Sequence, residues 1–293
     1  MAAASTQQTA RRRRLLTAAL LLCPALALVL AILIVPLVEL IQASFHRAEM
    51  GVIKPGFTVE NYETVLLSPL YWEIYAKTMG AAALVTALCA ILGYPVAAHL
   101  ARARKSLQPI LFFLIAAPLL INTVVRSYGW LLMLGRKGVV NTILEQLGII
   151  DQPLALSANY IGLIVGSTQV FLPFMILSVA ASLQGIDRRY LESADILGAS
   201  PVYRFITVEL PLAAPGLVAG SVLVFSLMLG AFVTPLMLGG TAVKYLSISV
   251  YTDALVLFNL PRAIALSMIL LVVVAGVYAV QARASRKVGI GQP

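Results

Sequence analysis

The chain has 293 residues, of which 60% are hydrophobic and 11% are charged, and its mean hydropathy is +0.95. Soluble domains carry about 25% charged residues, so the composition excludes an ordinary soluble domain and indicates a membrane protein. The net charge of +9 does not indicate nucleic-acid binding, because the basic residues form short clusters beside apolar runs, as topology determinants do. Cys23 and Cys89 both lie inside apolar runs without other Cys or paired His residues, so we expect no disulfide, no metal site and no cofactor.

The N-terminal part predicts a tail, a first membrane span and an external loop. Residues 1–14 end in four arginines and are expected to form a cytoplasmic tail. The apolar run that begins at Leu15 is longer than the roughly 7–15 apolar residues of a signal peptide. Residues 15–41 are therefore predicted to form a retained transmembrane helix. Residues 42–77 are predicted to form a periplasmic loop with a short surface helix in the sequence VENYETVLL.

Further apolar segments predict five more spans, so the expected fold is an all-α membrane protein with six transmembrane helices. The segments are 78–98, 109–134, 160–183, 212–238 and 263–280. The segment 109–134 is interrupted by Asn122, Thr123 and Arg126. Residues 78–282 would form a core of five helices, and residues 283–293 a C-terminal tail.

The distribution of basic residues predicts the orientation in the membrane. Segments on the side of the N-terminus carry nearly twice as many Lys and Arg residues as the segments on the opposite side, which is the asymmetry of the positive-inside rule. Both termini and the segment between the fourth and fifth spans are therefore predicted to be cytoplasmic.

The segment between the fourth and fifth spans, residues 184–211, carries charges of both signs and has its own helix signals. Asp187 is expected to cap a short helix, and Gly198 is expected to end it. Ser200 followed by Pro201 predicts that a second short helix begins at once. Two short helices joined by a glycine turn on the cytoplasmic face would suit the docking of a protein outside the bilayer.

The spacing within this segment resembles the signature loop of the inner-membrane permeases of bacterial ABC importers. That signature is Glu-Ala-Ala, three residues, Gly, nine residues and Ile-x-Leu-Pro. At the same spacing the chain has Glu192-Ser193-Ala194, then Gly198, then Val208-Glu209-Leu210-Pro211. Ser193 and Val208 are mild departures from the signature. Other stretches, among them FVTPLMLGG and LPRAIALSMIL, are similar to the spermidine/putrescine branch of these permeases.

The resemblance implies the type I permease fold of ABC importers, with residues 184–211 as a cytoplasmic coupling loop. The residues that would carry the coupling are Glu192, Ser193, Ala194, Gly198, Val208, Leu210 and Pro211. The implied function is that of the permease subunit of an ATP-driven importer in the bacterial inner membrane, for a polyamine or a related small polar or charged compound. The implied partners are two cytoplasmic ATP-binding subunits, a second permease subunit or a copy of this chain, and a periplasmic solute-binding protein.

The chain contains no recognisable catalytic motif. It has no phosphate-binding loop, no nucleophile elbow and no His-Glu-x-x-His sequence. We therefore expect no catalytic residue and no enzymatic activity in this chain. ATP hydrolysis is expected in a separate partner chain.

Five residues are candidates for the substrate pathway. Arg126 is a charged residue within a predicted span, where charges are functional candidates, although its alternative role is to anchor the external loop. The fifth span is interrupted by Gly and Pro residues from Gly230 to Gly240, and interrupted helices in transporters line cavities. The other candidates are therefore Ser226, Ala231, Phe232 and Thr234. Related permeases often have an acidic residue where this chain has Ala231, so polyamine, thiamine, ferric iron and phosphonate all stay open as substrates.

Two other classes of function are compatible with a six-span protein. An ion-coupled secondary carrier would act without an ATPase, but it would need acidic groups near the middle of the membrane. Glu39, Glu73 and Glu209 all lie near the ends of predicted spans, which disfavours a carrier. The second alternative is a membrane assembly factor that transports nothing.

Overall fold

The computed structural model describes residues 23–24, 27–49, 51–240 and 243–287. These residues fall into two compact units. The larger unit runs from Leu66 to Thr252 and resumes at Ile269, and the smaller unit comprises the described residues up to Val65 together with Asp253–Met268. The predicted N-terminal tail, the predicted start of the first span and the last six residues lie outside the described part of the chain.

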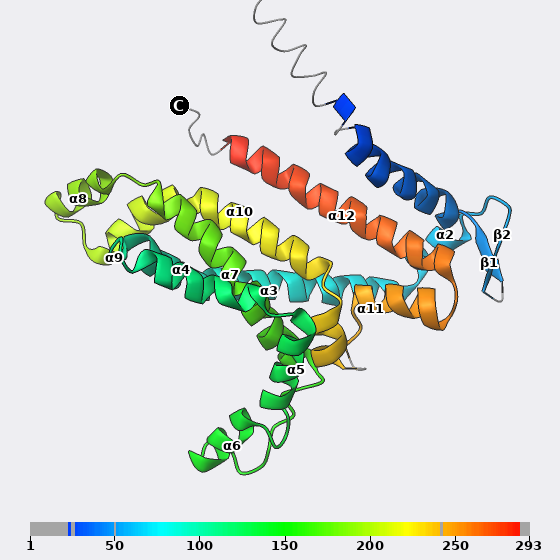
Figure 1. Ribbon diagram of the computed structural model, residues 1–293, viewed down its shortest axis with the longest axis horizontal. Helices are drawn as coiled ribbons and strands as arrows, with labels where there is room; N and C mark the ends of the chain where they lie inside the picture. Colours follow the sequence, from blue (N-terminus) through cyan, green and yellow to red (C-terminus); the bar gives the residue numbers. More distant parts are fainter. Residues whose placement is uncertain (1–22, 25–26, 50, 241–242, 288–293) are drawn as a thin grey trace, which may run out of the picture. The chain divides into compact units, whose positions relative to one another are not determined.

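Three long helices pack against one another in the larger unit (Figure 1). They are α3 (Pro69–Arg102), α7 (Tyr160–Gln184) and α10 (Leu210–Leu229). Small residues allow helix backbones to approach closely in a membrane. A Cβ atom added at Gly216 of α10 would lie 2.5 Å from the Cβ of Ser182 and 2.7 Å from the carbonyl oxygen of Ser178, both on α7. The contact between α7 and α10 therefore requires glycine at this position.

Five of the described helices are long and apolar enough to cross a membrane, and a bent pair of helices makes a sixth span if it is counted as one. The five are Ala27–Ser44, Pro69–Arg102, Tyr160–Gln184, Pro201–Leu229 and Leu260–Val280, the last being part of α12 (Leu260–Lys287). The all-helical membrane fold is thus confirmed, apart from one small hairpin. α3 begins well before residue 78, where the second span was expected to start, because Pro69 begins the helix in its first turn.

The predicted span 109–134 is broken at the residues that interrupt its sequence. α4 (Gln108–Ala116) and the 3-10 turn η1 (Ala117–Leu120) are followed by α5 (Thr123–Met133) after a bend of 92°. The side chain of Asn122 accepts a 2.8 Å hydrogen bond from the backbone N–H of Val124, so a new helix starts here. A short helix, α6 (Val139–Gln146), lies in the loop that follows.

The fifth span and the second short helix of the polar segment form one continuous helix, although the sequence prediction separated them. α9 (Pro201–Arg204), the π-helical turn η2 (Phe205–Glu209) and α10 follow one another without a break. Pro211 does not end the helix, because π-type adjustments of this kind accommodate proline in membrane helices. The helix ends at Leu229, before the predicted end at residue 238, because Gly230 forms its C-cap.

The described residues between α10 and α12 form only short elements. They are the π-helical turn η3 (Pro235–Gly239), α11 (Leu246–Tyr251) and the π-helical turn η4 (Thr252–Val256). Tyr245, at the start of α11, is fully buried, and Leu246 donates its backbone N–H to the hydroxyl of Thr78 on α3 at 3.0 Å. These contacts fix the end of the segment that follows α10.

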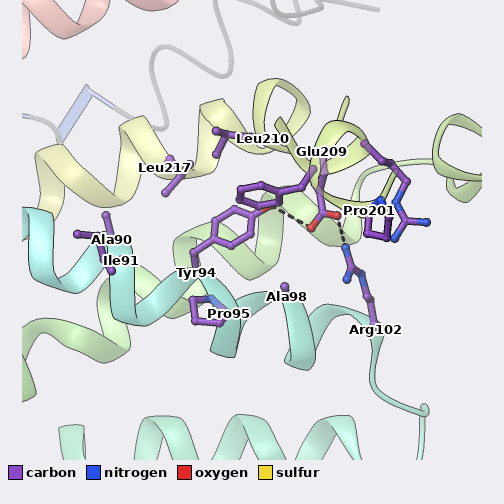
Figure 2. A pocket seen from close by; sticks show the side chains of 12 residues that line it. Ala90, Ile91, Tyr94, Pro95, Ala98, Arg102, Pro201, Glu209, Leu210 and Leu217 are labelled. Atoms are coloured by element: carbon purple, nitrogen blue, oxygen red, sulfur yellow. Dashed lines mark hydrogen bonds and ion pairs between the residues drawn. The ribbon is translucent and has the colours of Figure 1, made fainter. Parts of the chain in front are cut away.

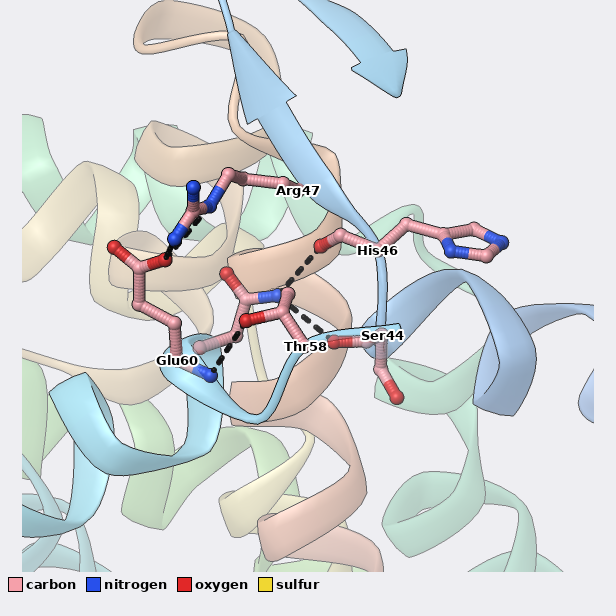
Figure 3. A network of polar contacts seen from close by, with 6 residues as sticks. Ser44, His46, Arg47, Thr58 and Glu60 are labelled. Carbon is pink, nitrogen blue, oxygen red and sulfur yellow. Dashed lines mark hydrogen bonds and ion pairs between the residues drawn. The ribbon is translucent and has the colours of Figure 1, made fainter. Parts of the chain in front are cut away.

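In the smaller unit a polar network organises the segment after the N-terminal helix (Figure 3). The segment contains the antiparallel strands β1 (Arg47–Glu49) and β2 (Val52–Lys54), and the helix α2 (Glu60–Leu67). The side-chain amide of Asn61 donates to the backbone carbonyls of Ser44 and His46, each at 2.8 Å. The hairpin was not expected, because strands of three residues are too short to show a sequence period. α2 lies where a short helix was predicted.

Candidate functional site

The polar segment after α7 contains the short helix α8 (Arg188–Ile196), which is followed by a turn and by α9. The side chain of Asp187 caps α8 by accepting a 2.9 Å hydrogen bond from a backbone N–H of the first turn. Gly198 has a φ of +79°, a left-handed conformation that favours glycine. The hydroxyl of Ser200 caps α9 in the same way at 3.3 Å. The predicted helices, turn and caps are therefore confirmed.

Large apolar side chains project outward from these two short helices. Ile196 and Leu197, at the end of α8, are each 86% exposed. Tyr190 on α8, and Val202 and Tyr203 on α9, are also exposed. We refer to these five residues as the docking surface. Exposed apolar patches that are rimmed by polar residues mark sites of interaction with other proteins or with membranes.

A hollow of about 540 Å³ lies beside the docking surface. Ala194, Gly198 and Val208 all line it, so three residues of the expected coupling motif come together here. Glu192 lies apart from them: it is exposed, and it forms no ion pair with any residue that the structure describes. Ser193 is turned back onto its own helix, where its hydroxyl donates to a backbone carbonyl at 2.7 Å.

A buried carboxylate belongs to the same region. Glu209, the last residue of η2, is only 4% exposed. Figure 2 shows it facing two side chains of α3: the hydroxyl of Tyr94 donates a 3.0 Å hydrogen bond to Glu209, and Arg102 forms an ion pair with it. The ring of Tyr94 also meets the ring of Phe205 edge-on, with the centroids 5.3 Å apart. This network ties the C-terminal end of α3 to the continuous helix Pro201–Leu229.

This network was not predicted from the sequence, in which Glu209 lies near the end of a predicted span and has no evident partner. One signal was available, because Glu209 occupies the variable position of the Val208-Glu209-Leu210-Pro211 motif inside an apolar stretch. A buried charge in such a stretch requires a partner of opposite charge.

A groove of about 600 Å³ runs alongside the network (Figure 2). Its walls are mostly apolar, with Ile91 and Ala98 from α3, and Leu210 and Leu217 from α10. Leu210, a residue of the expected coupling motif, thus lies in this groove and not in the hollow beside the docking surface. Pro211 is exposed next to it.

A second ion pair joins the two short helices. The Nη1 atom of Arg204 in α9 lies 2.6 Å from each of the two carboxylate oxygens of Asp195 in α8. Arg204 and Glu209 both belong to the helix Pro201–Leu229. This helix is therefore linked by charge to α8 at one point and to α3 at another.

Two of the five pathway candidates make contacts with the bent pair of helices. Arg126 on α5 donates a 2.8 Å hydrogen bond to the backbone carbonyl of Pro118 in η1, and so ties the two arms of the bend together. Thr234 is buried, and its hydroxyl lies 3.3 Å from the hydroxyl of Ser127, which is also on α5.

The other pathway candidates lie in different surroundings. The carbonyl of Ala231 accepts a 2.6 Å hydrogen bond from Ser247, and the ring of Phe232 packs against the ring of Tyr251 with the centroids 5.2 Å apart. The buried hydroxyl of Ser226 has no partner among the residues that the structure describes. A role for any of the five in substrate passage stays a prediction.

Residues 87–290 match the family of the binding-protein-dependent transport system inner membrane component. The chain belongs to this family. The permease is 34% identical over 252 residues to the spermidine/putrescine transport system permease protein PotB of Escherichia coli (strain K12), a match that covers 86% of the permease and 91% of PotB. It is 35% identical over 229 residues to the PotB protein of Haemophilus influenzae, covering 78% and 80% of the two chains. The inner membrane ABC transporter permease protein YdcU of E. coli is 31% identical over 237 residues, covering 76% and 74%.

Solved structures of transporters share the fold. A bacterial ABC transporter involved in the import of the acidic polysaccharide alginate superimposes with a TM-score of 0.72 at 20% identity, covering 98% of the permease and 100% of that chain. A bacterial alginate ABC transporter in complex with an alginate pentasaccharide-bound periplasmic protein gives a TM-score of 0.75 at 19% identity, covering 97% and 98%. The type I importer fold is thereby confirmed. The protein is a multi-pass permease subunit of an ABC importer in the inner membrane, and an ion-coupled carrier is disfavoured.

Proposed function

We propose that this permease passes a polyamine or a similar small solute into the cell. ATP hydrolysis in separate subunits, which bind to the docking surface, drives this transport. The observation that carries the proposal is the docking surface itself, five large apolar side chains beside a hollow lined by residues of the coupling motif. Burial of exposed apolar area is the dominant favourable term in the association of proteins. A soluble ATP-binding subunit that covers Ile196 and Leu197 would gain the free energy of burying their apolar surface.

The distribution of basic residues supports the orientation that the proposal needs. The positive-inside rule puts both termini and the docking surface in the cytoplasm, where ATP is available. Two ATP-binding subunits would serve two permease chains, which are this chain and either a second permease or a copy of itself. The absence of a phosphate-binding loop from the sequence assigns ATP hydrolysis to the partners.

A periplasmic solute-binding protein would deliver the substrate on the other side of the membrane. The alginate transporter that shares the fold was solved in complex with a periplasmic protein that holds its sugar, which supports such a partner. The names of the relatives, spermidine/putrescine permeases that cover most of this chain, support a polyamine as the substrate.

Co-purification from the native membrane tests the docking role. The permease is tagged at one terminus, extracted in mild detergent, and analysed by mass spectrometry for bound ATP-binding subunits. Ile196→Asp puts a charge on the docking surface, so we expect it to abolish recovery of the ATPase. Val52→Asp is the matched control, because Val52 is also an exposed β-branched apolar side chain but lies in the hairpin of the smaller unit. Equal recovery of the ATPase with both variants would contradict the proposal.

Uptake into liposomes tests the substrate. The purified complex is reconstituted with its binding protein, and the uptake of radiolabelled spermidine is measured with and without ATP inside the vesicles. We expect uptake only with ATP. Uptake without ATP by the permease alone would favour a secondary carrier, and ATP-driven uptake of another solute but not of spermidine would reject the polyamine.

A further inference from the structure

Glu209 is unusual among the charged residues of the larger unit because its carboxylate is almost fully buried while both of its partners come from another helix. Burying a carboxylate costs free energy unless it is paired and hydrogen-bonded. Tyr94 and Arg102 satisfy Glu209, and both belong to α3. The arrangement therefore holds the end of α3 against one particular point of the helix Pro201–Leu229.

The ion pair between Asp195 and Arg204 joins α8 and α9, the two helices that carry the docking surface. It joins α8 to the same helix, and only residues 205–208 of the turn η2 lie between Arg204 and Glu209. The two ion pairs thus form a series that leads from α8 through the start of the helix Pro201–Leu229 to α3. No break in the helix interrupts this series.

Because of the packing around Glu209, its polar contacts are important for the connection between α3 and the helix Pro201–Leu229. Beside it, the space between α3 and the helix Pro201–Leu229 is a groove of about 600 Å³ and not a close-packed interface. The Arg102 side chain is about half exposed, whereas Glu209 is buried. Breaking a pair of this kind by removing one charge leaves the buried partner uncompensated. Next to the groove, the two helices are joined by the contact of Tyr94 with Phe205 and by the contacts of Glu209 with Tyr94 and Arg102.

We infer that Glu209 is a positioning residue, which passes a displacement of the docking surface on to α3. The inference rests on the proposed function, because it assumes that an ATPase moves α8 and α9. When the docked subunits change their separation, α8 moves with them, and Arg204 carries the movement to the helix Pro201–Leu229. Glu209 then pulls the end of α3 in the same direction. Without the Glu209 carboxylate, α8 and the long helix would move while α3 lags behind.

Spin labels on the complete importer test the inference. The labels are attached to Arg189→Cys on α8 and Ser106→Cys just after α3, two exposed positions, with Cys23 replaced by Ser and Cys89 by Ala. We expect the distance between the labels to be the same in the nucleotide-free complex and in the complex trapped with ATP and vanadate. In Glu209→Gln we expect trapping to change this distance by about 2 Å or more, the scale of helix shifts in switching proteins.

Charge reversal provides the specific control. Arg102→Glu combined with Glu209→Arg restores the ion pair with opposite polarity, so the distance should again be independent of nucleotide. Arg104→Gln removes a neighbouring exposed charge that forms no ion pair with any described residue and should behave as the unaltered permease. In liposomes, Glu209→Gln should raise the ATP hydrolysed per spermidine transported about tenfold, within the usual range of coupling between sites. A purely structural defect would lower hydrolysis and transport together.

The possible failures are distinguishable. If Glu209→Gln retains its ATPase and shows the same distances and the same ATP-to-spermidine ratio as the unaltered permease, the inference is overturned and the proposed function stands. If the charge-reversed pair does not restore a label distance that is independent of nucleotide, the inference that this ion pair transmits the movement is likewise overturned. If no ATPase co-purifies with the unaltered permease, the proposed function fails and the inference fails with it.

Discussion

Gly198 determines the direction of the chain between α8 and α9. Its φ of +79° is left-handed, and a Cβ atom added there would meet nothing within 4 Å. The restriction is therefore on the backbone conformation and not on space. For residues other than glycine the left-handed conformation costs about 1–2 kcal/mol, and β-branched residues adopt it only as outliers.

The variant Gly198→Val should alter the angle between α8 and α9 and so disturb the docking surface. We expect the amount of co-purified ATPase to fall about tenfold, since a strain of 1–2 kcal/mol corresponds to a change of that size. Gly198→Asn should retain most of the ATPase, because Asn tolerates the left-handed conformation. Equal recovery with Val and Asn would show that the angle of the turn does not matter for docking.

Residues that act on their own neighbourhood were predictable, and residues that act across the fold were not. Asp187, Gly198 and Ser200 bond to or constrain the adjacent backbone, so the sequence around them was sufficient to predict their roles. Glu209 accepts a hydrogen bond from Tyr94, which lies 115 positions away along the chain. No local pattern reveals a contact over that distance, and only the requirement that a buried acid be paired pointed to it.

Among the helices, the contact between α7 and α10 depends on close approach at a few small residues. Gly216 faces the backbone of α7 so closely that a methyl group would overlap with it. The sequence showed that these segments are apolar and of spanning length. It did not show which helix faces are in contact, because the faces that meet lipid are as apolar as those that meet protein.

Gly216→Ala should destabilise the larger unit by about 1–3 kcal/mol, the usual cost of overpacking a core. We expect a lower thermal midpoint for the purified permease in detergent, with the exposed Cys23 replaced by Ser, measured by the fluorescence of a thiol-reactive dye that reports exposure of the buried Cys89. Gly276→Ala on α12 is the control, because a Cβ atom there meets nothing within 4 Å. Its midpoint should be unchanged or higher, since Ala favours a helix over Gly. A lower midpoint for both variants would locate the effect outside the α7–α10 contact.

The ends of the helices were harder to predict than their existence. α7 matches the predicted fourth span closely, because Asn159 caps its start through a 3.0 Å hydrogen bond and Gly185 ends it. The fifth span was predicted too short at its beginning, because residues 184–211 were assigned to the coupling loop and not to the span. The π-helical turn η2 allows the helix to continue, and nothing in the apolar pattern distinguishes such a turn from an end.

For the molecule as a whole, the proposed orientation rests on the distribution of Lys and Arg along the chain. Membrane-impermeant thiol reagents can test it with single cysteines in a permease in which Cys23 and Cys89 have been replaced. Val52→Cys should react in intact cells, because residues 42–77 are predicted to be periplasmic. Arg189→Cys should react only after the inner membrane has been opened. Labelling of Arg189→Cys in intact cells would show that the orientation is opposite to the proposed one, with the docking surface on the side of the membrane that lacks ATP.

The continuous helix Pro201–Leu229 has a mechanical consequence. Its 29 residues make a rod about 43 Å long at 1.5 Å per residue, with the docking surface at one end and the segment that holds Ala231 and Phe232 just beyond the other. If the rod tilts by about 10° about its docking end, Glu209, about 12 Å along the rod, moves by about 2 Å, and the far end moves by about 7 Å. A movement that is small at Glu209 is thereby amplified at the far end of the span, and the helix needs neither to bend nor to unwind.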